Sequence, residues 1–194
     1  MFMKQLVTIV IAGLLCAATA YADEYAQQVA DSRATVKAFM QQLKGELQKG
    51  IQEGGPVMAI GVCNDRAPAI AAVLGEQQGI DIGRTSLRVR NPANTPDVWE
   101  KAVLEEFEQR KLAGEDPAAI EKYATAGQED KTVFRYMKAI PTAELCVVCH
   151  GAEIAPDVAA KLEELYPQDQ ARGYQPGDLR GAFTITRALP AAEE

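Results

Sequence analysis

The chain has 194 residues, a formal net charge of −7, four cysteines and a single histidine, and 47% of its residues are hydrophobic. This length is enough for one domain with a sizeable core. An acidic chain without a basic cluster argues against a nucleic-acid-binding protein and against attachment to anionic membrane surfaces.

The first 22 residues have the layout of a secretory signal peptide. Lys4 precedes an uncharged, mostly apolar stretch, Leu6–Ala18, and Ala20-Tyr21-Ala22 forms a small-x-small cleavage site. The apolar stretch is shorter than the roughly 20 residues that span a bilayer, which disfavours an uncleaved anchor. We therefore expect residues 1–22 to be removed and residues 23–194 to form a single domain in the periplasm, free in solution.

The first part of this domain is predicted to be mostly helical. Apolar residues at helical spacing predict a helix over residues 23–49. Gly54-Gly55-Pro56 is typical of a turn. The short apolar run over residues 57–62 indicates a buried strand, and a second helix over residues 64–77 is expected to follow it.

The middle of the chain is predicted to alternate between strand, loop and helix. Apolar and polar residues alternate over residues 84–90, which is the period of a half-buried strand. A loop over residues 91–96 leads to a helix over residues 96–111, with Thr95 as its cap. A further short helix is expected to end near Tyr123.

The last third is predicted to contain strand, helix, helix and strand. Aromatic and branched residues indicate a strand over residues 132–140. A short helical turn follows from Thr142, a longer helix covers residues 156–166, and a last strand covers residues 180–187. Strands separated by helices of uneven length predict an α+β domain.

The segment Cys146-Val147-Val148-Cys149-His150 has the spacing of a c-type haem attachment site. Two intervening residues place both thiols on one helical face, and the next residue, His150, can reach the iron of the same haem. A redox dithiol is disfavoured because such motifs lie early in a βαβ unit. A zinc site would need Cys63 as its fourth ligand.

His150 is the only histidine, so a second histidine from the same chain cannot complete the axial coordination of the iron. After removal of the signal peptide the sulfur donors left are Cys63 and three methionines, Met40, Met58 and Met137. Methionine is a common ligand in small cytochromes, but each of these methionines is expected in the core. Cys63 ends the predicted strand, where a ligand could be presented rigidly, although a buried inert thiol is also possible.

Several motifs together resemble a family of PAS-like c-type haem domains (Tll-type), long described only as a domain of unknown function. Some members stand alone, and others form the extracytoplasmic input part of histidine kinases and chemoreceptors. The similar segments are residues 59–64, residues 83–94 with Trp99-Glu100, residues 146–151, residues 166–169, Gly173-Tyr174 and residues 177–183.

This resemblance implies a PAS-like antiparallel sheet flanked by helices, and it implies that Cys63 is the axial ligand opposite His150. An anionic thiolate stabilises ferric iron, so we expect a low reduction potential. Loss of the thiolate on reduction would open a position for a small gas such as NO or CO. Arginine side chains match the geometry of haem propionates, with Arg84 and Arg180 preferred over Arg88 and Arg90.

These features predict a haem protein that acts in redox or gas sensing, or in electron transfer. Since no signalling segment follows residue 194, its partner is expected to be a separate redox or signalling protein. An enzyme such as a peroxidase is disfavoured because no second histidine can serve as the distal acid–base group.

Overall fold

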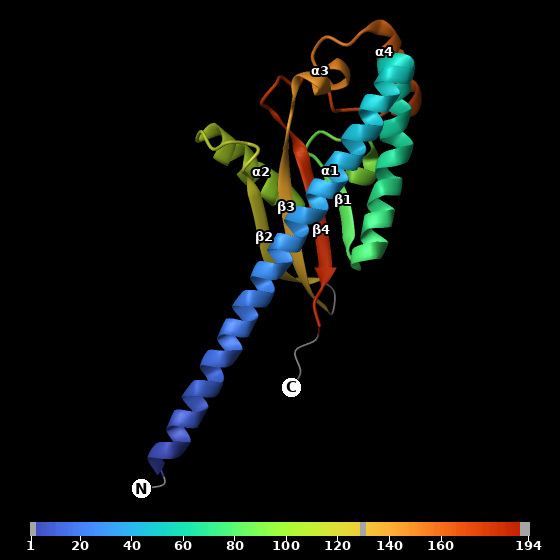
Figure 1. The fold of residues 1–194 in the computed structure, drawn as a ribbon. Helices are drawn as coiled ribbons and strands as arrows, with labels where there is room; N and C mark the ends of the chain where they lie inside the picture. Colours follow the sequence, from blue (N-terminus) through green and yellow to red (C-terminus); the bar gives the residue numbers. More distant parts are fainter. Residues whose placement is uncertain (1–2, 129–130, 191–194) are drawn as a thin grey trace.

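The computed structural model describes residues 3–128 and 131–190. Its centre is a four-stranded antiparallel sheet in the order β1-β4-β3-β2. The strands are β1 (Asp81–Thr85), β2 (Glu121–Gln128), β3 (Lys131–Pro141) and β4 (Leu179–Ala188). Helices lie on both faces of the sheet (Figure 1), which confirms the α+β class with a PAS-like sheet and a long N-terminal helix.

The helix α1 (Met3–Gln78) is a hairpin of two arms rather than one straight rod. Its backbone leaves the helical conformation at Gly54 and Gly55, and Gly55 has a φ of 72°, which favours glycine. The predicted turn is therefore confirmed. Figure 1 shows the second arm returning beside the sheet, and the first arm extending past the sheet at its N-terminal end.

The strand predicted over residues 57–62 is wrong, because these residues begin the second arm of α1. Ala59 and Ile60 are buried while Met58 is 49% exposed, so only one face of the helix is covered. A short apolar run does not distinguish a strand from one face of a buried helix.

The two sheet faces carry separate cores because side chains alternate along each strand. On one face α1 contributes Val36, Phe39, Ile70 and Leu74, which pack against Phe134, Tyr136, Phe183 and Ile185. On the other face α2 (Val98–Leu112) contributes Val103, Leu104 and Phe107, which pack against Ile120, Met137, Ala139, Leu179 and Ala182.

The middle of the chain differs from the predicted elements in two places. The first strand covers Asp81–Thr85 and not residues 84–90, because the Ser86 hydroxyl bonds to Arg88 and Arg180 and turns the chain. The short helix expected to end near Tyr123 is the strand β2, where Tyr123 stacks on Tyr136 across the strand pair.

The helix α2 begins later than predicted. Thr95 bonds to Pro92 and closes a short 3₁₀ turn, η1 (Pro92–Asn94). Asp97 is the actual cap, because its carboxylate accepts from the Glu100 N–H while the Glu100 carboxylate accepts from the Asp97 N–H. This reciprocal pair satisfies two otherwise free N–H groups.

The helices α3 (Glu144–His150) and α4 (Pro156–Leu165) lie at the end of the sheet beside the turn of the α1 hairpin (Figure 1). These two helices and the strands β3 and β4 confirm the elements predicted for the last third of the chain.

One described stretch, Asp23–Gln78, is long and apolar enough to cross a membrane by length and composition alone, because an 18-residue window within it has a mean hydropathy of 1.4. A core helix passes the same test, and Ile70 and Leu74 of this stretch are buried against the sheet.

Candidate functional site

The helix α3 carries Cys146, Cys149 and His150, all half-buried and none in a disulfide. Its last turn is closed by the Gly151 N–H, which donates to the Val147 carbonyl over 2.8 Å. A side chain at Gly151 would press against that same carbonyl, so glycine lets the chain turn away directly after His150.

The loop after α4 holds His150 from two sides. The His150 Nδ1 lies 2.8 Å from the Ala171 carbonyl oxygen, and the Tyr174 N–H donates to the His150 carbonyl over 2.9 Å. Because a carbonyl can only accept, Nδ1 carries the proton and Nε2 keeps its lone pair. This is the tautomer that a metal-binding histidine needs.

The electrostatic surroundings keep the His150 ring neutral. Burial, together with the positive charges of Arg180 and Arg90, lowers the pKa of His150 to about 2. The imidazole is therefore unprotonated at Nε2 throughout the physiological pH range, which is the state that binds metal ions.

Cys63 lies on the second arm of α1 and faces this site. Ile60, one helical turn earlier, belongs to the apolar cluster of α4, and Cys149 packs against that cluster. Burial raises the pKa of the Cys63 thiol, while Arg84, Arg90 and Arg180 oppose this effect with their positive charges. The helix, rather than the expected strand end, thus brings Cys63 near α3.

Arg180 reaches His150 through an irregularity in β4. Ile140 pairs with Gly181 and Pro141 pairs with Leu179, so Arg180 is the extra residue of a β-bulge. Its Nε lies 3.2 Å from Nδ1 and 3.4 Å from Nε2 of His150, and only Nε2 can accept from it because Nδ1 carries its own proton. One terminal nitrogen of Arg180 donates to the Ser86 hydroxyl over 3.2 Å. The guanidinium has to move aside before Nε2 can bind a metal.

Arg84 projects from β1 on the face of the sheet that α1 covers. Burial lowers the pKa of its guanidinium, and the nearby Cys63 and Tyr166 oppose this effect. Within residues 3–128 and 131–190, neither Arg84 nor Arg180 forms a salt bridge with a carboxylate. Two inward-facing cations without anionic partners make this site suited to a ligand that carries carboxylates.

The other two candidate arginines already have partners in the protein. Arg88 lies over the ring of Tyr174, 3.8 Å from its centroid, and donates to the Arg172 carbonyl. Arg90 forms a buried ion pair with Asp169 over 3.1 Å. Their roles are therefore structural in the described arrangement, and propionate binding by Arg84 and Arg180 stays a prediction.

The methionines differ from the expectation that all three lie in the core. Met40 and Met58 are each 49% exposed, and only Met137 is fully buried. Met137 packs against α2, on the face of the sheet opposite α1. Among the described residues no cluster of three or more His, Cys, Asp or Glu is arranged to hold a metal ion, so a four-ligand zinc site is not preformed.

Sequence reasoning missed Asp169 and Ala171, which support His150. Asp169 follows α4 in a segment that the family resemblance had singled out, but no local pattern ties it to His150. Tyr174 lies edge-on to His150 with 6.2 Å between the ring centroids. Trp99 lies in the first turn of α2, where the Arg135 guanidinium packs over its ring.

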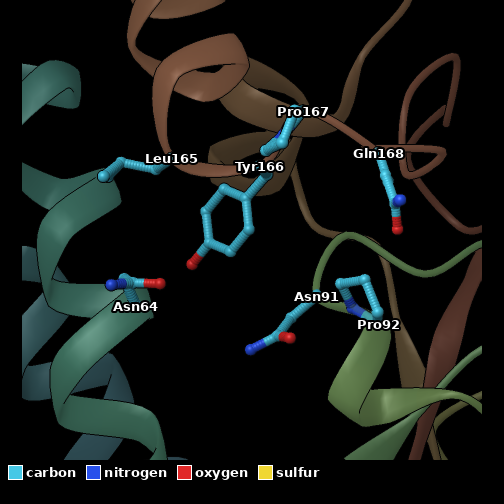
Figure 2. A pocket seen from close by; sticks show the side chains of 7 residues that line it. All are labelled: Asn64, Asn91, Pro92, Leu165, Tyr166, Pro167 and Gln168. Carbon is cyan, nitrogen blue, oxygen red and sulfur yellow. The ribbon is translucent and has the colours of Figure 1, made fainter.

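Two cavities flank the site. Figure 2 shows the smaller one, of about 130 Å³, with the Tyr166 ring between Asn64 of α1 and Asn91 of the loop after β1. The larger one, of about 330 Å³, is lined by Tyr174 together with Leu104 and Glu108 of α2.

The Tll0287-like family matches residues 16–188. This chain belongs to that family. A solved structure, described as the crystal structure of the cyanobacterial heme-protein Tll0287, matches with a TM-score of 0.58 and 23% identity. The alignment covers 84% of this chain and 98% of that one, and it supports the Tll0287-like fold. No curated protein matches the chain.

Proposed function

We propose that this Tll0287-like chain is a periplasmic cytochrome with one covalently bound haem c. Cys146 and Cys149 would form the thioethers, and His150 would be an axial ligand. The observation that carries this proposal is the hydrogen bond between His150 Nδ1 and the Ala171 carbonyl, which leaves Nε2 unprotonated and able to bind iron once Arg180 has moved aside. Membership of the Tll0287-like family and the heme-protein title of its structural relative support it.

The residues present fit a haem. Two thiols and a neutral imidazole lie on one short helix, and Cys63 approaches from α1 as the candidate ligand opposite His150. Arg84 and Arg180 would receive the propionates, since the described residues offer them no carboxylate.

The role we propose is redox or gas sensing, or electron transfer, with a separate redox or signalling protein as partner. A bound haem would supply one-electron exchange between ferric and ferrous iron. The protein's part is to exclude water and hold both axial side chains, and a thiolate from Cys63 would favour the ferric state. We assign no catalysis to the chain.

The proposal is tested by producing the full chain in a host that attaches haem in the periplasm. We expect haem staining to stay with the polypeptide on a denaturing gel, and to be lost when Cys146 and Cys149 are both replaced by Ala. Wild-type protein that carries no haem, or that binds zinc instead, would contradict the proposal.

Cys63→Ala tests the sixth ligand in the same preparation. We expect covalent haem to be retained and the thiolate-type low-spin signal in the optical and EPR spectra to disappear. Met58→Ala is the matched control, because Met58 lies on the same arm of α1 with an exposed side chain. If the Cys63→Ala spectra equal those of the wild type, Cys63 is not the ligand.

Carbon monoxide then separates the two roles. Binding of CO to the ferrous protein would support an exchangeable ligand and hence gas sensing. A ferrous protein that ignores CO would support a fixed electron carrier.

A further inference from the structure

Arg90 and Asp169 form a buried ion pair beside His150. The proposed function gives neither residue a contact with the haem. Their side chains are only 10% and 2% exposed, and the Arg90 Nε lies 3.1 Å from Asp169 Oδ1. The pair joins the loop after β1 to the loop after α4, so residues far apart in the chain meet here.

Both members of the pair bind the backbone of one residue, Ala171, on the two peptide groups that flank its Cα atom. Asp169 Oδ1 accepts from the Ala171 N–H over 2.9 Å, and Arg90 Nη2 donates to the Ala171 carbonyl over 3.2 Å. That carbonyl is also the acceptor for His150 Nδ1. Ala171 is fully buried, so no solvent can take over its hydrogen bonds.

Arg90 also binds the backbone at the end of α3. Its Nη2 donates to the Cys149 carbonyl over 2.5 Å, directly before His150. One guanidinium therefore connects the end of α3 with the loop that orients the His150 ring. A lysine ammonium could not make all of these contacts at once.

We propose that the Arg90–Asp169 pair positions the Ala171 carbonyl against His150 and thereby sets the strength of His150 as a ligand. This rests on the proposed haem function. A hydrogen bond from Nδ1 to a fixed acceptor makes Nε2 a better electron donor, which favours ferric iron and lowers the reduction potential. If the Ala171 carbonyl is held less firmly, its hydrogen bond to Nδ1 weakens and the reduction potential rises.

If the two charges acted on the haem only electrostatically, the reduction potentials of the variants would shift differently. Loss of the Arg90 charge alone would lower the potential, and loss of the Asp169 charge alone would raise it. Removing both charges would leave the potential almost unchanged. Positioning instead predicts a rise in all three variants, because each one releases Ala171.

The experiment uses the haem-loaded full chain as wild type, Arg90→Gln, Asp169→Asn and the double variant. The midpoint potential is measured by redox titration, and the iron–histidine stretch of the ferrous protein is measured by resonance Raman spectroscopy. Arg172→Ala is the matched control, because Arg172 binds the other oxygen of Asp169 from a side chain that is 41% exposed and has no bond to Ala171.

We expect a higher potential and a lower iron–histidine frequency in both single variants and in the double variant, with no change in Arg172→Ala. Opposite shifts in the two single variants, or an unshifted double variant, overturn the positioning role. If the double variant does not accumulate as loaded protein, Arg90→Lys keeps the charge and is expected to show the same upward shift; an unshifted Arg90→Lys overturns the proposal. A wild type without haem overturns the proposed function itself.

Discussion

At the scale of single residues, the β-bulge at Arg180 depends on Gly181. Gly181 has a φ of 153°, and a Cβ atom there would collide with the Thr85 carbonyl of the neighbouring strand. The bulge turns Arg180 toward His150 while Leu179 stays in the α2 core. The close approach of β1 and β4 thus supports both the sheet and the site.

We therefore expect Gly181→Ala to lower the free energy of unfolding by about 2 kcal/mol. Urea denaturation of the purified protein measures this. Gly45→Ala is the control, because no atom approaches that helical position and alanine is favoured in helices by up to about 1 kcal/mol. Equal free energies of unfolding for Gly181→Ala and the wild type would show that β1 and β4 can move apart at this point without loss of stability.

The segment Cys146–His150 could be singled out from the sequence, whereas the residues that support His150 could not. Cys146, Cys149 and His150 are close together in the chain, so their spacing alone indicates a shared helical face. The structure has a helix here, α3. Asp169 and Ala171 follow α4 and act on His150 through contacts that depend on how α3 and the segment after α4 pack.

At the scale of elements, α2 is fixed at its start by Asp97. The carboxylate caps the helix and also forms an ion pair with Arg135 over 2.7 Å. Burial alone would raise the pKa of Asp97, but hydrogen bonds from Arg135 and the Glu100 N–H outweigh it, so the pKa lies below its ordinary value. A carboxyl with a lowered pKa stabilises the fold above its unfolded pKa, and this contribution is lost as the pH falls through the folded pKa.

Two variants separate the contribution of the Asp97 cap to stability from the contribution of its charge. Asp97→Ala is expected to cost about 1 kcal/mol through the lost cap, whereas Asp97→Asn keeps a good capping side chain. The stability difference between the wild type and Asp97→Asn should shrink as the pH falls from about 6 to below about 3. Urea titrations across this pH range measure it, and a constant difference would show that the charge of Asp97 does not stabilise the fold.

Most elements were predictable where the local pattern was long. The strands β3 and β4 and the helix α4 follow from their own residues. The segment over 57–62 and the strand β2 were mistaken, because short apolar or mixed segments take the structure that their neighbours in space impose.

At the scale of the whole molecule, the α1 hairpin connects the predicted export signal to the site. Its first arm runs as a helix through the predicted cleavage position after Ala22, and its second arm carries Cys63. Removal of residues 1–22 stays a prediction, since the fold itself does not test it.

We expect the mature protein from a periplasmic fraction to begin at Asp23, because Ala20-Tyr21-Ala22 suits signal peptidase. N-terminal sequencing or intact mass measures this. Replacing Ala20 and Ala22 by Leu should leave the precursor uncleaved. A cytoplasmic protein that keeps Met1 would contradict the predicted location.

The sequence by itself determined which residues could hold a haem and that no second histidine is available, because these depend only on residue identity and local spacing. It also indicated the α+β class, since long periodic segments form their elements with little help. Only the tertiary structure decided that Cys63 approaches from a helix, that Arg84 and Arg180 lack carboxylate partners among the described residues, and that Arg90 and Asp169 support His150. These features arise from contacts between distant parts of the chain, which no local pattern records.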